Sequence, residues 1–222
     1  LNWHHKKETP DANSFAVTFD DGYANNLTNA LPILQELNIP ATVFVATAYI
    51  DSTSPFPFEN WKDAGSSHVS LEDWRALTSD ECARLLDSGV VELGAHTHTH
   101  QDFRENPDGF ECDLLENIRW LQERFGIREV PFAFPFGKRN QGFSGPTLVD
   151  AARRTGVICG LTSENEMTNI DADPFSWGRW TASEYDSSSS LAAKLSGKYA
   201  ALKGIWRKFK SLIRTPKPSH SR

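Results

Sequence analysis

The chain has 222 residues, of which 39% are hydrophobic and 23% charged, and its formal net charge is −6. These values exclude a disordered chain, and no apolar run approaches the ~20 residues needed to cross a bilayer. The charge is uneven, because the segment after Asp186 holds nine of the 23 Lys and Arg residues and no Asp or Glu. The preceding body therefore carries about −15, which argues against nucleic-acid binding.

A strand, a helix and a second strand are predicted at the beginning of the chain. Residues 15–19 alternate bulky and small side chains and run into Asp20-Asp21-Gly22, a pattern typical of a strand that enters a glycine turn. Apolar residues then recur at helical spacing over 27–37, and a Pro at position 40 precedes the apolar run 41–46. These three elements form a β-α-β unit.

The same alternation continues along the chain. Three further helix and strand pairs are expected, at 71–86 with 90–95, at 110–125 with 132–135, and at 147–154 with 157–161. Strands that alternate with helices indicate an α/β fold with a parallel sheet covered by helices. At this length, either a barrel or an open doubly wound sheet fits the pattern.

Candidate site residues lie at the carboxyl ends of three of these strands. They are Asp20-Asp21 after the first strand, His96 after the third, and Pro135-Phe136-Gly137 after the fourth. In barrels and open α/β sheets alike, active sites form at this edge. We therefore expect one site built from three separate segments. The aromatic stretch 52–70, with Phe56, Phe58 and Trp61, either flanks a sugar groove or covers one end of the barrel.

Adjacent carboxylates and a histidine cluster indicate a metal site. Asp20 and Asp21 resist joint ionisation unless a cation or a donor compensates them, although the dipeptide alone also fits a helix cap. On a continuing strand, His96 and His100 would lie about 13 Å apart, whereas a helical turn brings them to about 6 Å. The strand must then end at His96, with His98 pointing elsewhere.

Two imidazoles and one carboxylate suit zinc or a similar divalent ion and leave positions for water. A bound divalent ion lowers the pKa of water and polarises a carbonyl oxygen. The second aspartate can then take the proton of the water. With one carboxylate as metal ligand and its neighbour as general base, the site suits the hydrolysis of an amide or an ester.

The segments 17–23 (VTFDDGY) and 96–100 (HTHTH) resemble the polysaccharide deacetylase family with the NodB homology domain, which is similar to carbohydrate esterase family 4. The resemblance covers roughly residues 14–185, including the segments 30–34, 40–45, 133–137 and 173–175 before Arg179. It implies a distorted (β/α) barrel of about seven parallel strands in a single domain, residues 1–186. It also implies removal of N-acetyl or O-acetyl groups from a polysaccharide or an amino sugar.

The resemblance assigns roles to the four polar residues already singled out. By matching motif positions, Asp20 is the general base that activates a water on the metal, and Asp21, His96 and His100 are the metal ligands. Zinc is the expected ion, with cobalt, nickel or manganese as alternatives. The expected partner is an acetylated polysaccharide or oligosaccharide.

Three further residues receive roles in the same way. The backbone amide of Tyr23 is implied to help hold the oxyanion, a role that needs little reorganisation in a rigid turn. Pro135 and Phe136 are implied to line the substrate groove.

The chain departs from the family pattern at two places. Where many members carry an arginine that steers the catalytic aspartate, this chain has Ala133, and Arg179 is a candidate replacement from another strand. Arg179 alternatively only stacks beside Trp177 and Trp180, whose rings are also candidates for sugar contacts. The family's late Leu-x-His motif is missing, because no histidine lies between His100 and position 220, so the proton donor is unassigned.

These departures keep two other functions open. One is a catalytically silent relative that binds glycans through the same groove. The other is a hydrolase that uses the same metal centre on a non-sugar amide, since one fold hosts many reactions.

The end of the chain is predicted to be separate from the barrel. Residues 187–214 show the spacing of a basic amphipathic helix, which either packs on the acidic barrel or contacts an anionic membrane surface or another chain. Residues 215–222 are predicted to be disordered. No charged and apolar leader precedes the first strand in this chain, so a signal peptide is absent or removed, and a cytoplasmic or membrane-associated location is favoured over a periplasmic or secreted one.

Overall fold

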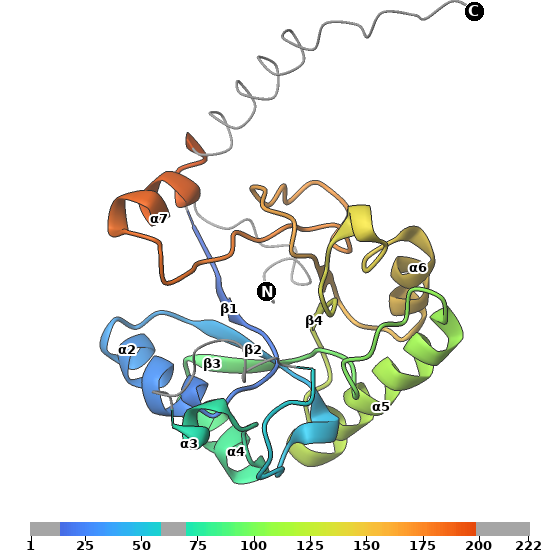
Figure 1. Ribbon diagram of the computed structural model, residues 1–222, viewed down its shortest axis with the longest axis horizontal. Coiled ribbons are helices and arrows are strands. Elements are labelled where there is room, and N and C mark those ends of the chain that lie inside the picture. Colours follow the sequence, from blue (N-terminus) through green and yellow to red (C-terminus); the bar gives the residue numbers. More distant parts are fainter. Residues whose placement is uncertain (1–13, 59–69, 199–222) are drawn as a thin grey trace, which may run out of the picture.

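The computed structural model describes residues 14–58 and 70–198. Its strands form one parallel sheet with the order β1-β2-β3-β4-β5, so each strand pairs with the next one along the chain. Because the order never reverses, the right-handed crossovers place all connecting helices on the same face of the sheet. Figure 1 shows α2, α4, α5 and α6 around the outside of the strands. The fold is therefore of the barrel type, and the doubly wound alternative is excluded.

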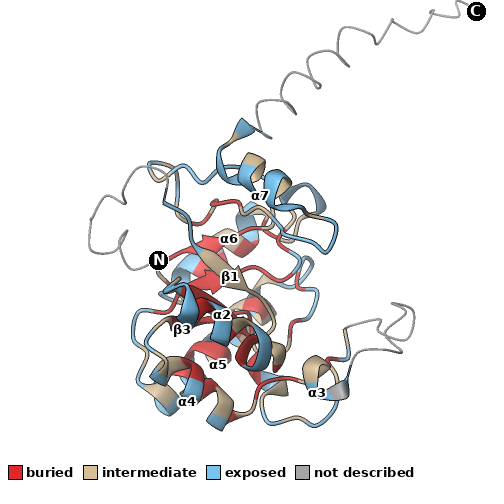
Figure 2. Ribbon diagram, turned by 90° about the vertical axis from the view of Figure 1, so that its left-hand side faces the viewer, coloured by how far each residue is buried: buried red, intermediate tan, exposed pale blue. Residues whose placement is uncertain are grey.

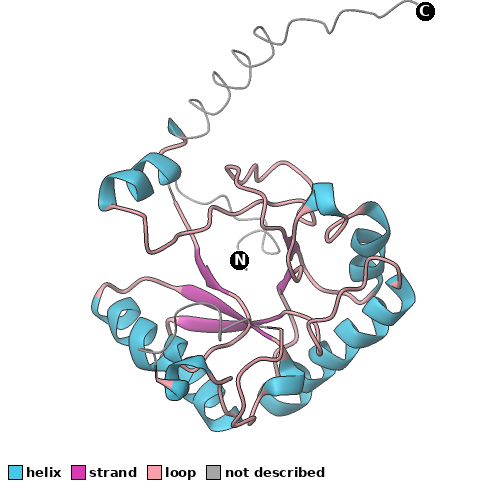
Figure 3. Ribbon diagram, viewed as in Figure 1, coloured by secondary structure: helices cyan, strands magenta, loops and turns pink. Residues whose placement is uncertain are grey.

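All five predicted strands are present, and each is shorter than expected. Figure 3 shows the strands in magenta, inside the surrounding helices. They are β1 (Val17–Phe19), β2 (Ala41–Val45), β3 (Val91–Ala95), β4 (Phe132–Ala133) and β5 (Gly160–Leu161). The expected number of about seven strands is approximate for this chain. Among the described residues the sheet has five strands, and a parallel bridge between Leu161 and Trp177 marks where a later segment continues beside β5.

Helices connect the strands at the predicted places, with one correction, and two short 3-10 helices lie where none was predicted. They are η1 (Asn26–Ala30, a π-helix), α2 (Leu31–Glu36), η2 (Thr47–Tyr49), α3 (Leu71–Trp74), α4 (Ser79–Asp87), α5 (Pro107–Phe125), η3 (Arg139–Gln141), α6 (Pro146–Arg154) and α7 (Ser188–Leu195).

The single helix predicted over 71–86 is wrong, because the chain divides into α3 and α4. Between them, Ala76 forms an antiparallel bridge with Tyr23, and the Leu77 amide donates to the Gly22 carbonyl oxygen. Thr78 then starts α4 with a capping box, in which its side chain accepts from the Glu81 amide and the Glu81 side chain accepts from the Thr78 amide. The sequence carries this Thr-x-x-Glu signal, but the apolar periodicity runs through it.

The core lies between the sheet and the inner sides of the helices. All five residues of β2 are buried, and Figure 2 shows buried positions on the strands and on the sides of α5 and α6 that face them. Along α5, Phe110, Leu114 and Leu121 are buried at helical spacing. This long helix is therefore anchored along most of its length, which matters for the site described below.

The predicted helix at 187–214 is interrupted within the described residues. Ser187 caps α7 by accepting a hydrogen bond from the Ser190 amide, and α7 ends at Leu195 before Gly197, which has φ of 72°. Positions 199–222, which include most of the predicted amphipathic run and the proposed membrane contact, lie outside the described residues. No helix in the described ranges is long and apolar enough to span a bilayer.

Two neighbouring leucines on α5 test this packing. Leu114 is fully buried and Leu115 is 40% exposed. We expect Leu114→Ala to lower the free energy of unfolding by about 2–5 kcal/mol, because it leaves a cavity in the core. Leu115→Ala is expected to lower it by less than about 1 kcal/mol. Urea denaturation followed by circular dichroism measures both, and equal losses would contradict the placement of α5.

Candidate metal centre

The site lies at the carboxyl edge of the sheet, where β1 and β3 end on either side of β2. The Asp20-Asp21-Gly22 turn follows β1, and His96 follows β3 directly. β1 and β3 both pair with β2, so their ends lie on the same edge. The expectation that these separate segments meet at one rim is confirmed for the aspartates and the histidines.

The turn after β1 has a conformation that aims Asp21 into the site. Asp21 has φ of 70° and Gly22 has φ of 87°, both in the left-handed region. A Cβ atom on Gly22 would lie 2.9 Å from the Val45 Cγ1 atom, so only glycine fits here. The Ala46 amide donates to the Asp21 carbonyl oxygen at 3.1 Å, which fixes the turn against the end of β2.

The histidine segment leaves the strand at His96, as the distance argument required. The expected helical turn is wrong, however, because Thr97 and His100 have φ of 62° and 53°, and the segment forms a turn outside the helical region. The rings of His96 and His100 nevertheless lie 5.0 Å apart between centroids. The His98 ring points elsewhere, as predicted, and its Nδ1 lies 2.9 Å from the Thr47 hydroxyl.

Three ligand atoms converge at the centre of the site. The Asp21 Oδ1 atom lies 3.3 Å from Nε2 of His96 and 3.4 Å from Nε2 of His100. These side chains offer one ligand atom each within 4.8 Å of one another, and could hold a metal ion. Oδ1 of Asp21 is buried and accepts no hydrogen bond within the described ranges. A buried carboxylate oxygen facing two imidazole nitrogens suits a cation between them.

The protonation of the two rings is compatible with metal binding. Nδ1 of His96 lies 2.8 Å from the Ala133 carbonyl oxygen, which can only accept, so Nδ1 carries a proton and Nε2 is the nitrogen that faces Asp21. Although burial lowers the pKa of His96, the charges of Asp20 and Asp21 raise it above its ordinary value, so a metal ion replaces a proton on Nε2. Burial and the neighbouring His96 lower the pKa of His100 to about 4, so its ring is neutral at neutral pH. Nε2 of His100 is therefore free to bind a metal ion, Nε2 of His96 binds one when it gives up its proton, and the three residues fit a divalent cation such as zinc.

Asp20 has a different environment from its neighbour Asp21. Arg179 donates two hydrogen bonds to its carboxylate, from Nη1 to Oδ1 at 2.7 Å and from Nη2 to Oδ2 at 2.8 Å. Arg179 also donates to the Thr18 hydroxyl at 2.9 Å. Although burial raises the pKa of Asp20, the charges of His96 and Arg179 lower it below its ordinary value. Asp20 is thus held ionised and in a fixed orientation.

A sequence model of the polysaccharide deacetylase family matches residues 7–157 of this chain. The chain belongs to the polysaccharide deacetylase family. The resemblance found in the VTFDDGY and HTHTH segments is confirmed by this match, and both segments lie within the matched range.

Curated relatives in this family include poly-beta-1,6-N-acetyl-D-glucosamine N-deacetylases from two staphylococci. The Staphylococcus epidermidis protein is 24% identical over 168 residues, which are 72% of this chain and 51% of that protein. The Staphylococcus aureus (strain MRSA252) protein is 20% identical over 182 residues, 78% of this chain and 56% of that protein. The chain thus spans about half the length of the curated relatives it matches.

Solved structures share the fold. The Streptococcus pyogenes deacetylase PplD in complex with acetate has a TM-score of 0.67 at 19% identity, covering 87% of this chain and 75% of that one. A de-N-acetylase from Aggregatibacter actinomycetemcomitans has a TM-score of 0.68 at 18% identity, covering 87% of this chain and 79% of that one. The distorted barrel expected for the family is therefore confirmed.

Aromatic rings enclose His100 on two sides. Phe58 stacks on its ring with the centroids 3.9 Å apart, and Phe136 meets it edge to face at 4.9 Å. Phe136 is 45% exposed, whereas Pro135 is buried. Phe56 is buried, so the reading that the 52–70 rings cover the barrel end holds for this ring.

The remaining predicted residues lie at the edge of the site or outside the described residues. The Tyr23 ring packs against Phe56 at 4.7 Å, and the oxyanion role of its amide stays a prediction. Trp180 is half-buried next to Arg179 in the chain, and Trp61 lies outside the described residues. The proton donor is still unassigned, and four of the seven histidines, His4, His5, His68 and His220, are also outside the described residues.

Two polar residues beside the site were missed by the sequence reasoning. Asp113 and Asn117 lie on α5 and bond to the backbone of the histidine turn. A signal was available, because both occur at i, i+4 spacing beside the apolar stripe of Phe110, Leu114 and Leu121. Asn117 within such a stripe needs a specific partner, since buried amides are hydrogen-bonded.

Proposed function

We propose that this protein is a metal-dependent deacetylase that removes acetyl groups from an acetylated polysaccharide or oligosaccharide. The observation that carries the proposal is the convergence of Asp21 Oδ1 with Nε2 of His96 and His100. Membership of the polysaccharide deacetylase family supports the same reaction class.

The three converging residues are the proposed ligands of a divalent cation, with zinc as the first choice. Two imidazoles and a carboxylate form a ligand set that leaves coordination positions open for water and substrate. When bound, such an ion polarises an acetyl carbonyl oxygen and lowers the pKa of water. Cobalt, nickel and manganese accept the same donors.

Asp20 is the proposed general base. It lies next to the ligand Asp21 in the chain, but its carboxylate is turned to Arg179, which holds it by two hydrogen bonds. A base must be ionised and oriented before it can take a proton, and the guanidinium supplies both conditions. In this proposal Arg179 replaces the arginine that many family members carry at the position of Ala133.

The proposed substrate is an N-acetylated glycan, and O-acetylated glycans are the alternative. The staphylococcal relatives are N-deacetylases of poly-beta-1,6-N-acetyl-D-glucosamine, which favours an amide. The exposed ring of Phe136 beside His100 is the proposed contact for a sugar face, together with its chain neighbour Pro135 and with Trp180, which follows Arg179 in the chain.

The rival proposal is a catalytically silent relative that binds glycans at the same place. The unassigned proton donor favours it. The pairing of Arg179 with Asp20 counts against a silent relative, because Arg179 supplies the positive charge that Ala133 cannot provide. A hydrolase of a non-sugar amide is the other alternative, and a substrate screen separates it from a glycan deacetylase.

Metal removal tests the proposed activity. We expect acetate release from at least one of poly-beta-1,6-N-acetyl-D-glucosamine, chitin oligomers, peptidoglycan and acetylated xylan. A chelator is expected to abolish release, and added Zn²⁺ or Co²⁺ to restore it, because the ion activates the nucleophile. An enzymatic acetate assay measures the rate.

Two variants control this experiment. Asp20→Asn removes the proposed base and is expected to lower the rate at least about 100-fold. Asp150→Asn makes the same change on the exposed face of α6 and should leave the rate unaltered. Binding of a glycan without acetate release under any metal would support the silent relative instead.

Replacement of Arg179 tests the orientation of Asp20. We expect Arg179→Leu to lower kcat/KM about 100-fold or more, since Asp20 loses both charged hydrogen bonds. Arg179→Lys should recover only part of the rate, because an ammonium cannot form the paired contact. Arg154→Leu, which removes an exposed arginine paired with Glu111, is the control. A fully active and folded Arg179→Leu protein would refute the role.

A further inference from the structure

The turn that carries His100 needs support from outside itself. Thr97 is fully buried and His100 is nearly so, and both have backbone angles in the left-handed region that non-glycine residues seldom adopt. The segment forms no helix or strand, and within it the His100 amide donates to the Thr97 hydroxyl at 3.1 Å. This single bond leaves the backbone groups of positions 98 and 99 to other partners, so the conformation also depends on groups that bond to it from neighbouring elements.

Asp113 on α5 supplies three such bonds. Its Oδ1 accepts from the amides of His98 at 2.6 Å and Thr99 at 3.0 Å, and its Oδ2 accepts from the Thr99 hydroxyl at 2.6 Å. One carboxylate thus binds two consecutive amides between the two proposed ligands. Hydrogen bonds to a charged acceptor are stronger than those between neutral groups.

Asn117, one helical turn further along α5, holds the start of the same segment. It is completely buried, and its Nδ2 lies 2.9 Å from the Thr97 carbonyl oxygen and 2.8 Å from the Val45 carbonyl oxygen. The first contact is to the histidine turn, and the second is to the last residue of β2. Asn117 therefore connects the turn to the strand that lies between β1 and β3.

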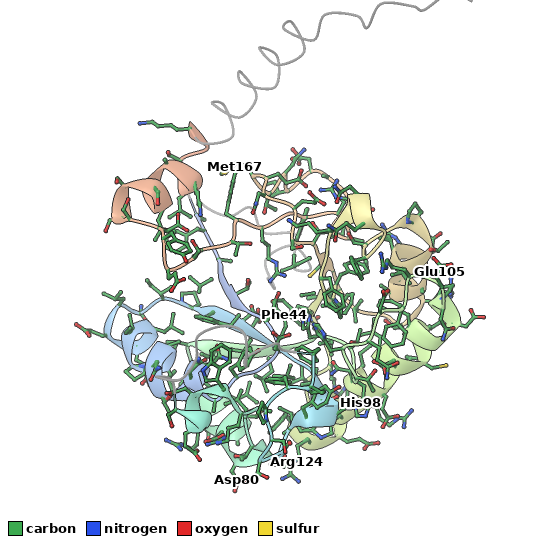
Figure 4. The ribbon with its side chains drawn as sticks, viewed as in Figure 1. Phe44, Asp80, His98, Glu105, Arg124 and Met167 are labelled. Carbon is green, nitrogen blue, oxygen red and sulfur yellow. The ribbon has the colours of Figure 1, made fainter. Side chains whose placement is uncertain are left out.

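The 3-10 helix η2 also forms hydrogen bonds with this segment. The Ala48 amide donates to the His98 carbonyl oxygen at 2.9 Å, and the Tyr49 hydroxyl donates to the Thr99 carbonyl oxygen at 2.8 Å. Figure 4 shows His98 beside η2 and α5. Between them, α5 and η2 bond to successive backbone groups from position 97 to position 99.

From these contacts we infer that Asp113 and Asn117 are positioning residues for the metal centre, an inference that rests on the proposed metal-dependent function. Neither side chain bonds to a ligand atom in the described part of the chain. They act through the backbone of positions 97–99, which directs the His100 ring toward Asp21. Because α5 is anchored in the core by Leu114 and Leu121, the position of His100 is coupled to the packing of this helix.

Cobalt binding tests the inference without relying on activity. The full chain and its variants are freed of metal and titrated with Co²⁺, whose visible absorption reports the geometry of the ligands. Asp113→Ala is expected to weaken Co²⁺ binding about tenfold to a hundredfold and to change the absorption spectrum. Glu116→Gln, on the same helix, removes a carboxylate that contacts Arg119 at the surface and should match the unaltered chain.

A milder variant covers the case in which Asp113→Ala does not fold. Asp113→Asn keeps one acceptor oxygen and is expected to fold, with a smaller but measurable loss of Co²⁺ affinity. Circular dichroism of each metal-free protein establishes that it is folded. Unchanged affinity and an unchanged spectrum in folded Asp113 variants would overturn the positioning role alone. Failure of the unaltered chain to bind Co²⁺ would refute the metal centre and this inference together.

Discussion

Three groups that carry lone pairs, the Asp21 Oδ1 atom and the Nε2 atoms of His96 and His100, face one another across 3.3 and 3.4 Å. In a partly buried site this arrangement is unfavourable unless a proton or a metal cation lies between these atoms. The protein nevertheless enforces it with left-handed backbone at Asp21, Thr97 and His100. Strained residues of this kind persist where the surrounding structure fixes them, and they gather at functional sites. The rest of the site is built around this convergence.

The adjacent aspartates show how one dipeptide can supply two different functions. The left-handed conformation at Asp21 turns its carboxylate toward the two histidines, while Asp20 faces Arg179. A carboxylate oxygen that accepts no hydrogen bond can bind a cation. A carboxylate that a guanidinium keeps ionised and oriented can act as a base. Environment rather than residue type therefore separates the proposed ligand from the proposed base, as in other sites with paired carboxylates.

The sequence predicted the features that depend on short-range pattern. Alternating strands and helices gave the α/β class, and the polar residues after strand ends gave Asp20, Asp21, His96 and His100 as one cluster. The pairing of Arg179 with Asp20 spans 159 residues, so Arg179 became a candidate only through the family resemblance, since no local pattern distinguishes such an arginine from a surface one. The irregular turn at 97–100 was missed, because the bond from the His100 amide to the Thr97 hydroxyl is joined by bonds from α5 and η2 that no local pattern predicts.

The central claim is that these three side chains bind one divalent ion. X-ray absorption spectroscopy of the zinc-loaded protein tests it most directly. We predict nitrogen and oxygen ligands only, at about 2.0–2.2 Å, with an imidazole contribution that decreases in His100→Ala. Sulfur ligands at about 2.3 Å, or a spectrum that His100→Ala leaves unchanged, would contradict the account.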